Sequence, residues 1–289
     1  MSERSNENRL GIDPVALEEN DELITPPPEQ ESLKFITPTE FVELPSRGQF
    51  YNSDHPLHNQ DVVEIKHMTT KEEDILTSVT LLKKGLALDR MLENILIDRR
   101  IKIDDLLLGD KNALVIAARL HGYGPEYETT VKCPECLESQ NYSFDLNSLK
   151  IKFPTDELLT KYNIEKTINN TFLIPLPETD YTVEAKFLIG HDEKKVSKAQ
   201  EHKKKKNFPE TPVSDFLRFV IVSVNNIKDT SSLNNFINTL PALHARYIRK
   251  IYNDLLPTLD MKHSFTCSVC EHTGATEVPL NANFFWFNA

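Results

Sequence analysis

Glycine is scarce in this sequence, with 8 residues among 289, and the glycines are scattered along the chain. A glycine-rich loop that could wrap a phosphate cannot be assembled from them, which argues against P-loop and dinucleotide-binding proteins. Long apolar runs are missing too, and none approaches the ~20 residues needed to cross a bilayer. The first residues are polar and charged instead of an apolar secretion signal. We therefore expect no membrane span and a protein that stays in the compartment where it is made.

Positive charge is also in short supply. The chain has 33 lysines and arginines against 44 acidic residues, which gives a net charge of -11 and a pI near 5.4. An acidic chain repels phosphate backbones, so binding to nucleic acid is disfavoured. The sequence also lacks the G-x-S-x-G and H-E-x-x-H motifs of hydrolases. We expect neither an enzyme nor a small-molecule substrate.

Only four cysteines are present, and all of them belong to C-x-x-C pairs, Cys133 with Cys136 and Cys267 with Cys270. Each pair follows a predicted helix and strand and precedes another strand. Two residues between cysteines let one tight turn aim both sulfurs at a common point, and two such turns complete a tetrahedron. Four thiolates in this geometry favour zinc over hard cations. The spacing predicts one structural zinc ion in a zinc ribbon.

Other roles for these cysteines fit the sequence less well. Disulfides are disfavoured without a secretion signal, and a thioredoxin-like redox pair would explain one motif but not two. Iron–sulfur ligation remains open, although its usual clustered spacings are missing. His263 and His272 lie close to the second pair and could replace a sulfur. A zinc deaminase is a poor match, because Thr266 stands where its signature has proline and the first cysteine pair would have no role.

The fold class that we predict is α+β, with helices and short strands around a discontinuous zinc ribbon. Residues 1–34 form an acidic, proline-bearing segment that we expect to be a disordered tail. Residues 35–289 are predicted to be a single body stapled by zinc. Its ribbon would come from residues 128–146 and 263–280, and an inserted subdomain from residues 150–260, because the cysteines on either side of the insertion must meet.

Several local patterns make testable expectations. Thr69 and Thr70 precede Glu72 and Glu73 by three residues, which predicts a capping box at the start of a helix that Gly85 ends. Asp110 is expected to cap a helix that Gly122 closes. The apolar run of residues 213–224 predicts one further helix.

Two surface features could carry binding. Lys203–Lys206 is the one basic concentration; it could contact an acidic partner or simply be a solvated helix end. Phe284, Phe285, Trp286 and Phe287 are consecutive aromatics, and these side chains cannot all point to one face of a strand. They could anchor an interface with another chain, or fold back onto the ribbon.

The sequence also resembles a known family, the baseplate hub family of T-even-type, contractile-tailed bacteriophages. Three strings in the first half of the chain carry the resemblance: Phe41-Val-Glu-Leu-Pro-Ser-Arg-Gly-Gln-Phe-Tyr51, Leu81-Leu-Lys-Lys-Gly85 and Gly109-Asp-Lys-Asn-Ala113. It continues through Gly122-Tyr-Gly-Pro-Glu-Tyr127, both C-x-x-C units and the closing Phe284-Phe-Trp286. The inserted middle region matches less clearly.

This resemblance implies a virus-encoded hub subunit or hub-assembly factor that acts by binding other baseplate hub proteins. It implies a location in the virion tail baseplate, or in the host cytoplasm during assembly. The alternative that the residues leave open is a zinc-ribbon accessory factor associated with nucleic acid, against which the acidic charge counts.

Overall fold

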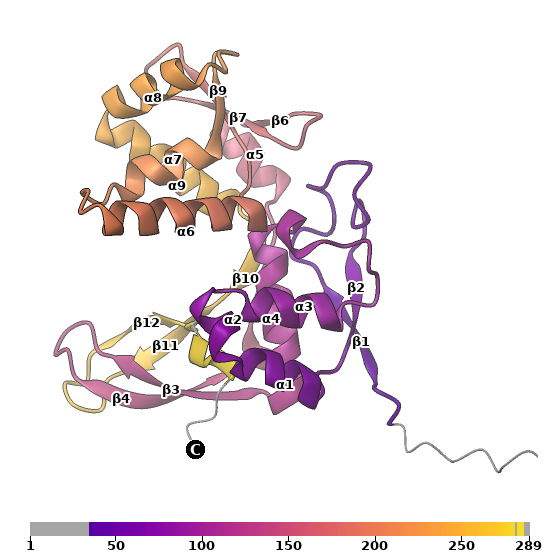
Figure 1. The fold of residues 1–289 in the computed structure, drawn as a ribbon. Helices are drawn as coiled ribbons and strands as arrows, with labels where there is room; N and C mark the ends of the chain where they lie inside the picture. Colours follow the sequence, from indigo (N-terminus) through magenta and orange to yellow (C-terminus); the bar gives the residue numbers. More distant parts are fainter. Residues whose placement is uncertain (1–34, 281, 286–289) are drawn as a thin grey trace, which may run out of the picture. The chain divides into compact units, whose positions relative to one another are not determined.

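The computed structural model describes residues 35–280 and 282–285 (Figure 1). Residues 37–289 cluster as one compact unit, and the expected disordered tail of residues 1–34 lies outside the described residues. Helices and short antiparallel strands are mixed along the chain, which confirms the α+β prediction. No helix within the described ranges is both long and apolar enough to cross a membrane.

The helices are α1 Thr70–Thr77, α2 Val79–Lys83, α3 Ala87–Ile95, α4 Leu108–Tyr123, α5 Asp156–Tyr162, α6 Gly190–Lys205, α7 Pro212–Val220, α8 Thr230–Thr239 and α9 Ala242–Leu255, with 3-10 turns η1 Ile103–Asp105, η2 Leu146–Ser148 and η3 Ala282–Phe285. The longest helices are α4 and α6, with 16 residues each, followed by α9 with 14. The strands are β1 Thr39–Glu43, β2 Val62–Lys66, β3 Glu126–Lys132, β4 Ser139–Asp145, β5 Lys150–Lys152, β6 Glu165–Lys166, β7 Phe172–Pro175, β8 Thr182–Ala185, β9 Ile221–Val224, β10 Thr258–Asp260, β11 Lys262–Thr266 and β12 Thr273–Glu277.

Helix α4 is the element around which the larger core forms. Nine of its residues between Gly109 and Arg119 are buried. The helix contacts β1, α3, β10 and the turns η2 and η3. A helix that is apolar on most of its surface must be covered on most sides. Its covering elements come from both ends of the chain, so α4 ties the N-terminal and C-terminal segments together.

Gly109 lets the first turn of α4 approach the chain before β10, because a Cβ atom at this position would overlap the carbonyl oxygen of Pro257. We expect Gly109→Ala to destabilise the protein by about 1–3 kcal/mol, as overpacking against backbone does. Gly122→Ala in the last turn of the same helix is the matched control. Its Cβ would meet only the flexible end of Met68, and alanine favours the helix. Urea unfolding of both variants measures the difference; equal midpoints would contradict the close approach.

The chain between the two cysteine pairs forms an insertion that begins and ends side by side. Strand β5 pairs antiparallel with β10, so the insertion leaves and rejoins the rest of the chain at the same place. Beyond this pair lie the four-stranded antiparallel sheet β6-β7-β8-β9 and helices α5 to α9. A separate small core, built around Val183, Leu217 and Ile248, lies entirely within the insertion. The predicted subdomain boundaries of 150 and 260 agree with this strand pair but stay a prediction.

The capping box of α1 is confirmed, while two other local expectations are corrected. The Glu72 carboxylate accepts hydrogen bonds from the backbone N–H and the hydroxyl of Thr69 (2.9 and 2.6 Å). The helix expected to run on to Gly85 is interrupted at Ser78, whose extended backbone separates α1 from α2. The helix expected over residues 213–224 ends at Val220. Ile221–Val224 is instead strand β9, where its β-branched residues pair with β8.

Asp110 does not cap α4 as expected but lies inside its first turn, fully buried. Its carboxylate accepts hydrogen bonds from the backbone N–H and hydroxyl of Ser46 (2.9 and 2.5 Å) and from the Tyr51 hydroxyl (2.7 Å). The Tyr51 oxygen in turn accepts from the backbone N–H of Leu107 (3.1 Å). One acidic residue therefore fixes the loop between β1 and β2 onto the start of α4.

Candidate metal centre

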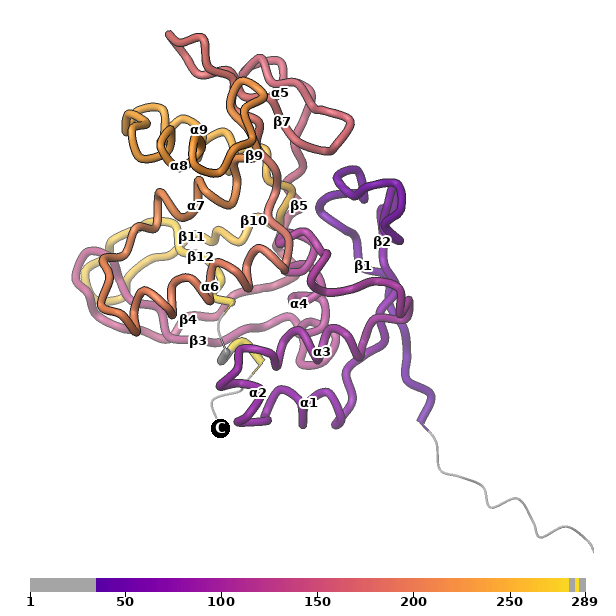
Figure 2. Tube along the Cα trace, turned by 45° about the horizontal axis from the view of Figure 1, so that its top comes forward, coloured from indigo at the N-terminus to yellow at the C-terminus, as the bar shows by residue number. Residues whose placement is uncertain are grey.

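Two hairpins carry the four cysteines. Strands β3 and β4 pair from Glu126 to Asp145, and their connection holds Cys133 and Cys136. Strands β11 and β12 pair from Lys262 to Glu277, and their connection holds Cys267 and Cys270. The two hairpins lie against each other although they come from distant parts of the sequence (Figures 1 and 2). The fold therefore brings the two pairs together, as the spacing predicted.

The two cysteine turns have the same backbone geometry. In the first turn, the N–H of Cys133 donates to the carbonyl of Glu138 (2.9 Å), and the N–H of Leu137 donates to the carbonyl of Cys133 (3.0 Å). In the second turn, the equivalent bonds are made at Cys267, with the carbonyl of His272 (2.9 Å) and the N–H of Glu271 (3.1 Å). The repeated geometry indicates that both turns serve the same purpose. Each turn presents two sulfurs at the end of its hairpin.

Both turns also require a left-handed residue directly after the second cysteine. Leu137 has φ of 63° and Glu271 has φ of 55°, in a region that non-glycine residues rarely adopt. Neither residue is a type that eases this conformation, so the turn geometry costs free energy in both hairpins. A ligand that binds the two turns together would offset this cost.

The four sulfur atoms all lie within 4.8 Å of one another. The Sγ atoms of Cys133 and Cys270 are 3.7 Å apart, as are those of Cys136 and Cys267. A tetrahedral ion with Zn–S bonds of ~2.3 Å holds its sulfurs about 3.8 Å apart, which fits these distances. A disulfide needs about 2.05 Å, and the four thiols are free.

Electrostatics also favours a cation at this point. The backbone N–H groups of Cys270 and Val269 stabilise the thiolate of Cys267 and lower the pKa of this thiol to about 7. At Cys136 the backbone N–H of Glu138 acts in the same direction, but burial and the three neighbouring sulfurs raise the pKa to about 12. Without a metal, one thiolate therefore opposes ionisation of the next. A divalent cation removes this opposition and allows all four sulfurs to ionise.

Side chains on β4 hold the two hairpins together beside the sulfurs. The Tyr142 hydroxyl donates to the carbonyl of Ser264 (2.6 Å), and the amide nitrogen of Gln140 donates to the carbonyl of Thr266 (3.2 Å). The amide oxygen of Gln140 accepts from the backbone N–H and the hydroxyl of Ser268 (2.8 and 2.7 Å). Local sequence patterns did not mark Gln140 and Tyr142 as part of the site. The two residues are two positions apart on one strand, so their side chains lie on the same face, and this spacing could have indicated their shared role.

Neither of the nearby histidines joins the sulfur cluster. The ring of His263 packs edge-on against Phe144, with ring centres 5.1 Å apart. His272 contributes its carbonyl to the second cysteine turn. Among the described residues, the metal-ligating group here consists of the four cysteines.

Two of the four closing aromatics, Phe284 and Phe285, lie among the described residues. Phe284 and Phe285 are only 1% and 2% exposed, so they are core residues of this chain and offer no free surface. Phe284 packs against Tyr127, and its carbonyl accepts a hydrogen bond from Nε of the buried Arg119 (3.0 Å). Trp286 and Phe287 lie outside the described residues. Of the two readings given for these aromatics, the burial of Phe284 and Phe285 agrees with the one in which they fold back onto the core.

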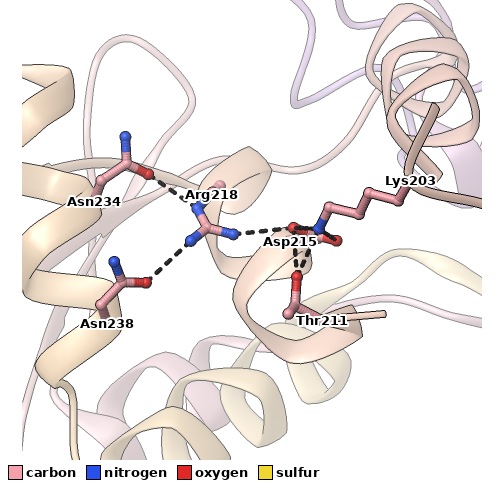
Figure 3. A network of polar contacts seen from close by, with 6 residues as sticks. All are labelled: Lys203, Thr211, Asp215, Arg218, Asn234 and Asn238. Carbon is pink, nitrogen blue, oxygen red and sulfur yellow. Dashed lines mark hydrogen bonds and ion pairs between the residues drawn. The ribbon is translucent and has the colours of Figure 1, made fainter. Parts of the chain in front are cut away.

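The basic run Lys203–Lys206 is partly committed to contacts within the chain. Figure 3 shows Lys203 of α6 beside Asp215 of α7, whose two carboxylate oxygens accept from the ammonium group (2.8 and 2.6 Å). Arg218 also donates to Asp215 (3.0 Å) and reaches the side chains of Asn234 and Asn238 on α8 (2.9 and 3.0 Å). The first lysine of the run therefore serves the packing of three helices.

We expect Asp215→Ala to destabilise the protein by about 1–2 kcal/mol at neutral pH, because both cations lose their partner at a site only partly shielded from water. Burial raises the pKa of Asp215, but the hydrogen bonds and charge of Lys203 lower it by more. The stabilisation is thus present above the unfolded-state pKa of about 3.9 and is lost as the pH falls through the lower folded-state value. Urea unfolding at pH 7 and pH 3 should show a smaller deficit at pH 3 than at pH 7. Glu210→Ala, at an exposed neighbour, is the control.

Comparison with known families gives one match. The family model described as T4 bacteriophage base plate protein matches residues 37–286, which include both cysteine hairpins and the insertion between them. Searches of curated proteins and of solved structures gave no significant match.

Proposed function

The chain belongs to the T4 bacteriophage base plate protein family, and on that premise we propose that it is a baseplate hub component or a hub-assembly factor. A member of this family has a structural role in the phage baseplate, which requires binding to other phage proteins. The assignment to the hub rests on the motifs of the N-terminal half, such as the Phe41–Tyr51 string, together with the paired cysteine hairpins.

The observation that carries a structural role for the hairpins is the closed set of four sulfurs. We propose that they hold one zinc ion and that the two hairpins form a zinc ribbon. Four cysteine ligands leave no position for water or substrate, whereas catalytic zinc keeps one open. The centre would then act by fixing the hairpins relative to α4 and by adding folding free energy, without catalysing a reaction.

Quantitative mass spectrometry of purified virions and of hub intermediates tests the function directly. A fixed number of copies per virion would support a hub component. Presence in hub intermediates with absence from virions would support an assembly factor. Absence from both would overturn the proposal, as would a strong, salt-sensitive affinity for DNA in the purified chain, which would favour the nucleic-acid-associated alternative.

A further inference from the structure

A second group of metal-ligating side chains lies far along the chain from the cysteines. It consists of Glu40 on β1, His67 directly after β2 and His121 in the last turn of α4. One carboxylate oxygen and one nitrogen from each imidazole lie within 4.8 Å of one another. Both histidines are half-buried. Two imidazoles and one carboxylate are a donor set that zinc accepts in proteins.

The backbone directs these three side chains to one place. Glu40 lies two residues before the buried Val42, so both side chains leave β1 on the same face. His67 lies two residues after the buried Ile65, and its N–H donates to the carbonyl of Pro38 (2.9 Å), which extends the pairing of β1 with β2. His121 lies one helical turn beyond the buried Ala117 on α4. Each of the three side chains therefore lies on the same face of its element as a buried residue, at the edge of the core.

The two imidazole rings lie side by side, at a spacing that a shared ion accommodates. Their centres are 5.1 Å apart and their planes differ by 19°. With Zn–N bonds of ~2.0–2.1 Å, each ring centre lies about 3.2 Å from the ion, so a tetrahedral angle places the two centres about 5.2 Å apart. The rings are stacked in the structure, so binding of the ion requires each ring to turn about its Cβ–Cγ bond until one nitrogen points at the ion.

An unsatisfied nitrogen supplies independent support. His67 Nε2 is buried and has no hydrogen-bond partner among the described residues. Four other buried side-chain atoms among the described residues also have no partner, but none of them belongs to the Glu40, His67 and His121 group. A bound ion would offset the cost of the lost hydration at His67.

We propose that Glu40, His67 and His121 bind a second divalent transition-metal ion of the zinc type. Three protein ligands leave one tetrahedral position, which water fills in the isolated chain. The ion would link β1, the end of β2 and the end of α4, so it would clamp the N-terminal strand to the central helix. A cavity of about 840 Å³, lined by residues such as Tyr51 and Lys186, does not include these three side chains.

Equilibrium dialysis of the full-length protein against micromolar zinc, followed by elemental analysis, tests the proposal. We expect two zinc ions per chain in the wild type, one in His121→Gln, and weakened second-site binding in Glu40→Gln. His202→Ala, at an exposed position of α6, is the matched control and should keep two. One zinc per chain in the wild type would overturn the proposal, and so would a second zinc that survives both His121→Gln and Glu40→Gln.

Cobalt substitution separates the two sites and checks the fold of the variants. Cobalt at the cysteines gives thiolate-to-metal charge-transfer absorption, whereas nitrogen and oxygen ligands give only weak visible bands. We expect His121→Gln to keep the thiolate absorption in full and to lose the weak component that fills second in the wild type. A His121→Gln protein that retains this second component contradicts the assignment. Full thiolate absorption shows that the variant is folded at the cysteine hairpins, so the loss is then specific.

Discussion

Cys133→Ser is expected to abolish zinc binding at the cysteines and to leave the protein aggregated or unfolded under conditions in which the wild type is stable. Cys133 is fully buried at the sulfur cluster, and a serine hydroxyl is a poor replacement for a thiolate ligand. Structural zinc contributes binding free energy to folding, on the order of 10 kcal/mol in small zinc domains. The net stability of a typical domain is about 5–15 kcal/mol. Loss of the zinc would therefore remove the whole stability of a domain at the lower end of this range.

The measurement combines zinc content with thermal unfolding of purified protein. Val269→Ser is the matched control, because Val269 lies in the second cysteine turn, is 64% exposed and offers no ligand atom. We expect this control to bind zinc and unfold like the wild type. A strong chelator should reproduce the effect of Cys133→Ser on the wild type. A soluble Cys133→Ser protein with normal stability would refute the structural role of the metal.

Asp110→Ala should be the second most damaging change, with a loss of about 3–5 kcal/mol, because three buried donors lose their only described acceptor oxygens at once. These donors are the N–H and hydroxyl of Ser46 and the hydroxyl of Tyr51. Tyr51→Phe removes one of these bonds, together with the bond that the Leu107 N–H donates to the Tyr51 oxygen, and should cost less, about 1–3 kcal/mol. Asp156→Ala, in the exposed first turn of α5, controls for the loss of an acidic residue near a helix N-terminus. Equal stability of the Asp110 and Asp156 variants would refute the role of this network.

The pH dependence of this site has the opposite sign to that of Asp215. Burial raises the pKa of Asp110, and the hydrogen bonds from Ser46 and Tyr51 only partly oppose it. The folded state then binds the proton more tightly than the unfolded state. The stabilisation from this group is fully present below the unfolded-state pKa of about 3.9 and is lost as the pH rises through the higher folded-state value. Unfolding measured from pH 4 upward should therefore show a declining contribution in the wild type that Asp110→Asn lacks.

Local patterns in the sequence identified the parts of the structure that depend on neighbours in the chain. The capping box at Thr69 and Glu72 needs only a three-residue spacing, and the cysteine turns need only two residues between ligands. The four cysteines could be grouped because both turns had the same form. The prediction that they bind zinc stays a prediction, while membership of the baseplate family is confirmed.

Features that depend on contacts between distant parts of the chain could not be predicted from local patterns. Asp110 looked like a helix cap because a cap is the commonest local use of aspartate near a helix start. Its actual partners, Ser46 and Tyr51, lie 64 and 59 positions away. The apolar run of residues 213–224 carried no signal for the switch at Val220, since buried strands and buried helices are alike in composition over short lengths. Burial of Phe284 likewise depends on Tyr127, which a local pattern does not reveal.

The distance along the chain between the two cysteine pairs has a consequence for biosynthesis. Cys136 and Cys267 lie 131 positions apart, so a ribosome that adds ~5–20 residues per second exposes the second pair on the order of ten seconds after the first. During that interval the first hairpin has two sulfurs and cannot complete a tetrahedral shell. If the cysteines bind zinc as proposed, metal binding at this site would mark that translation has passed the insertion. A truncated chain that ends before Cys267 would lack the metal of the cysteine site, and the host's proteases could remove it before it reached a growing tail.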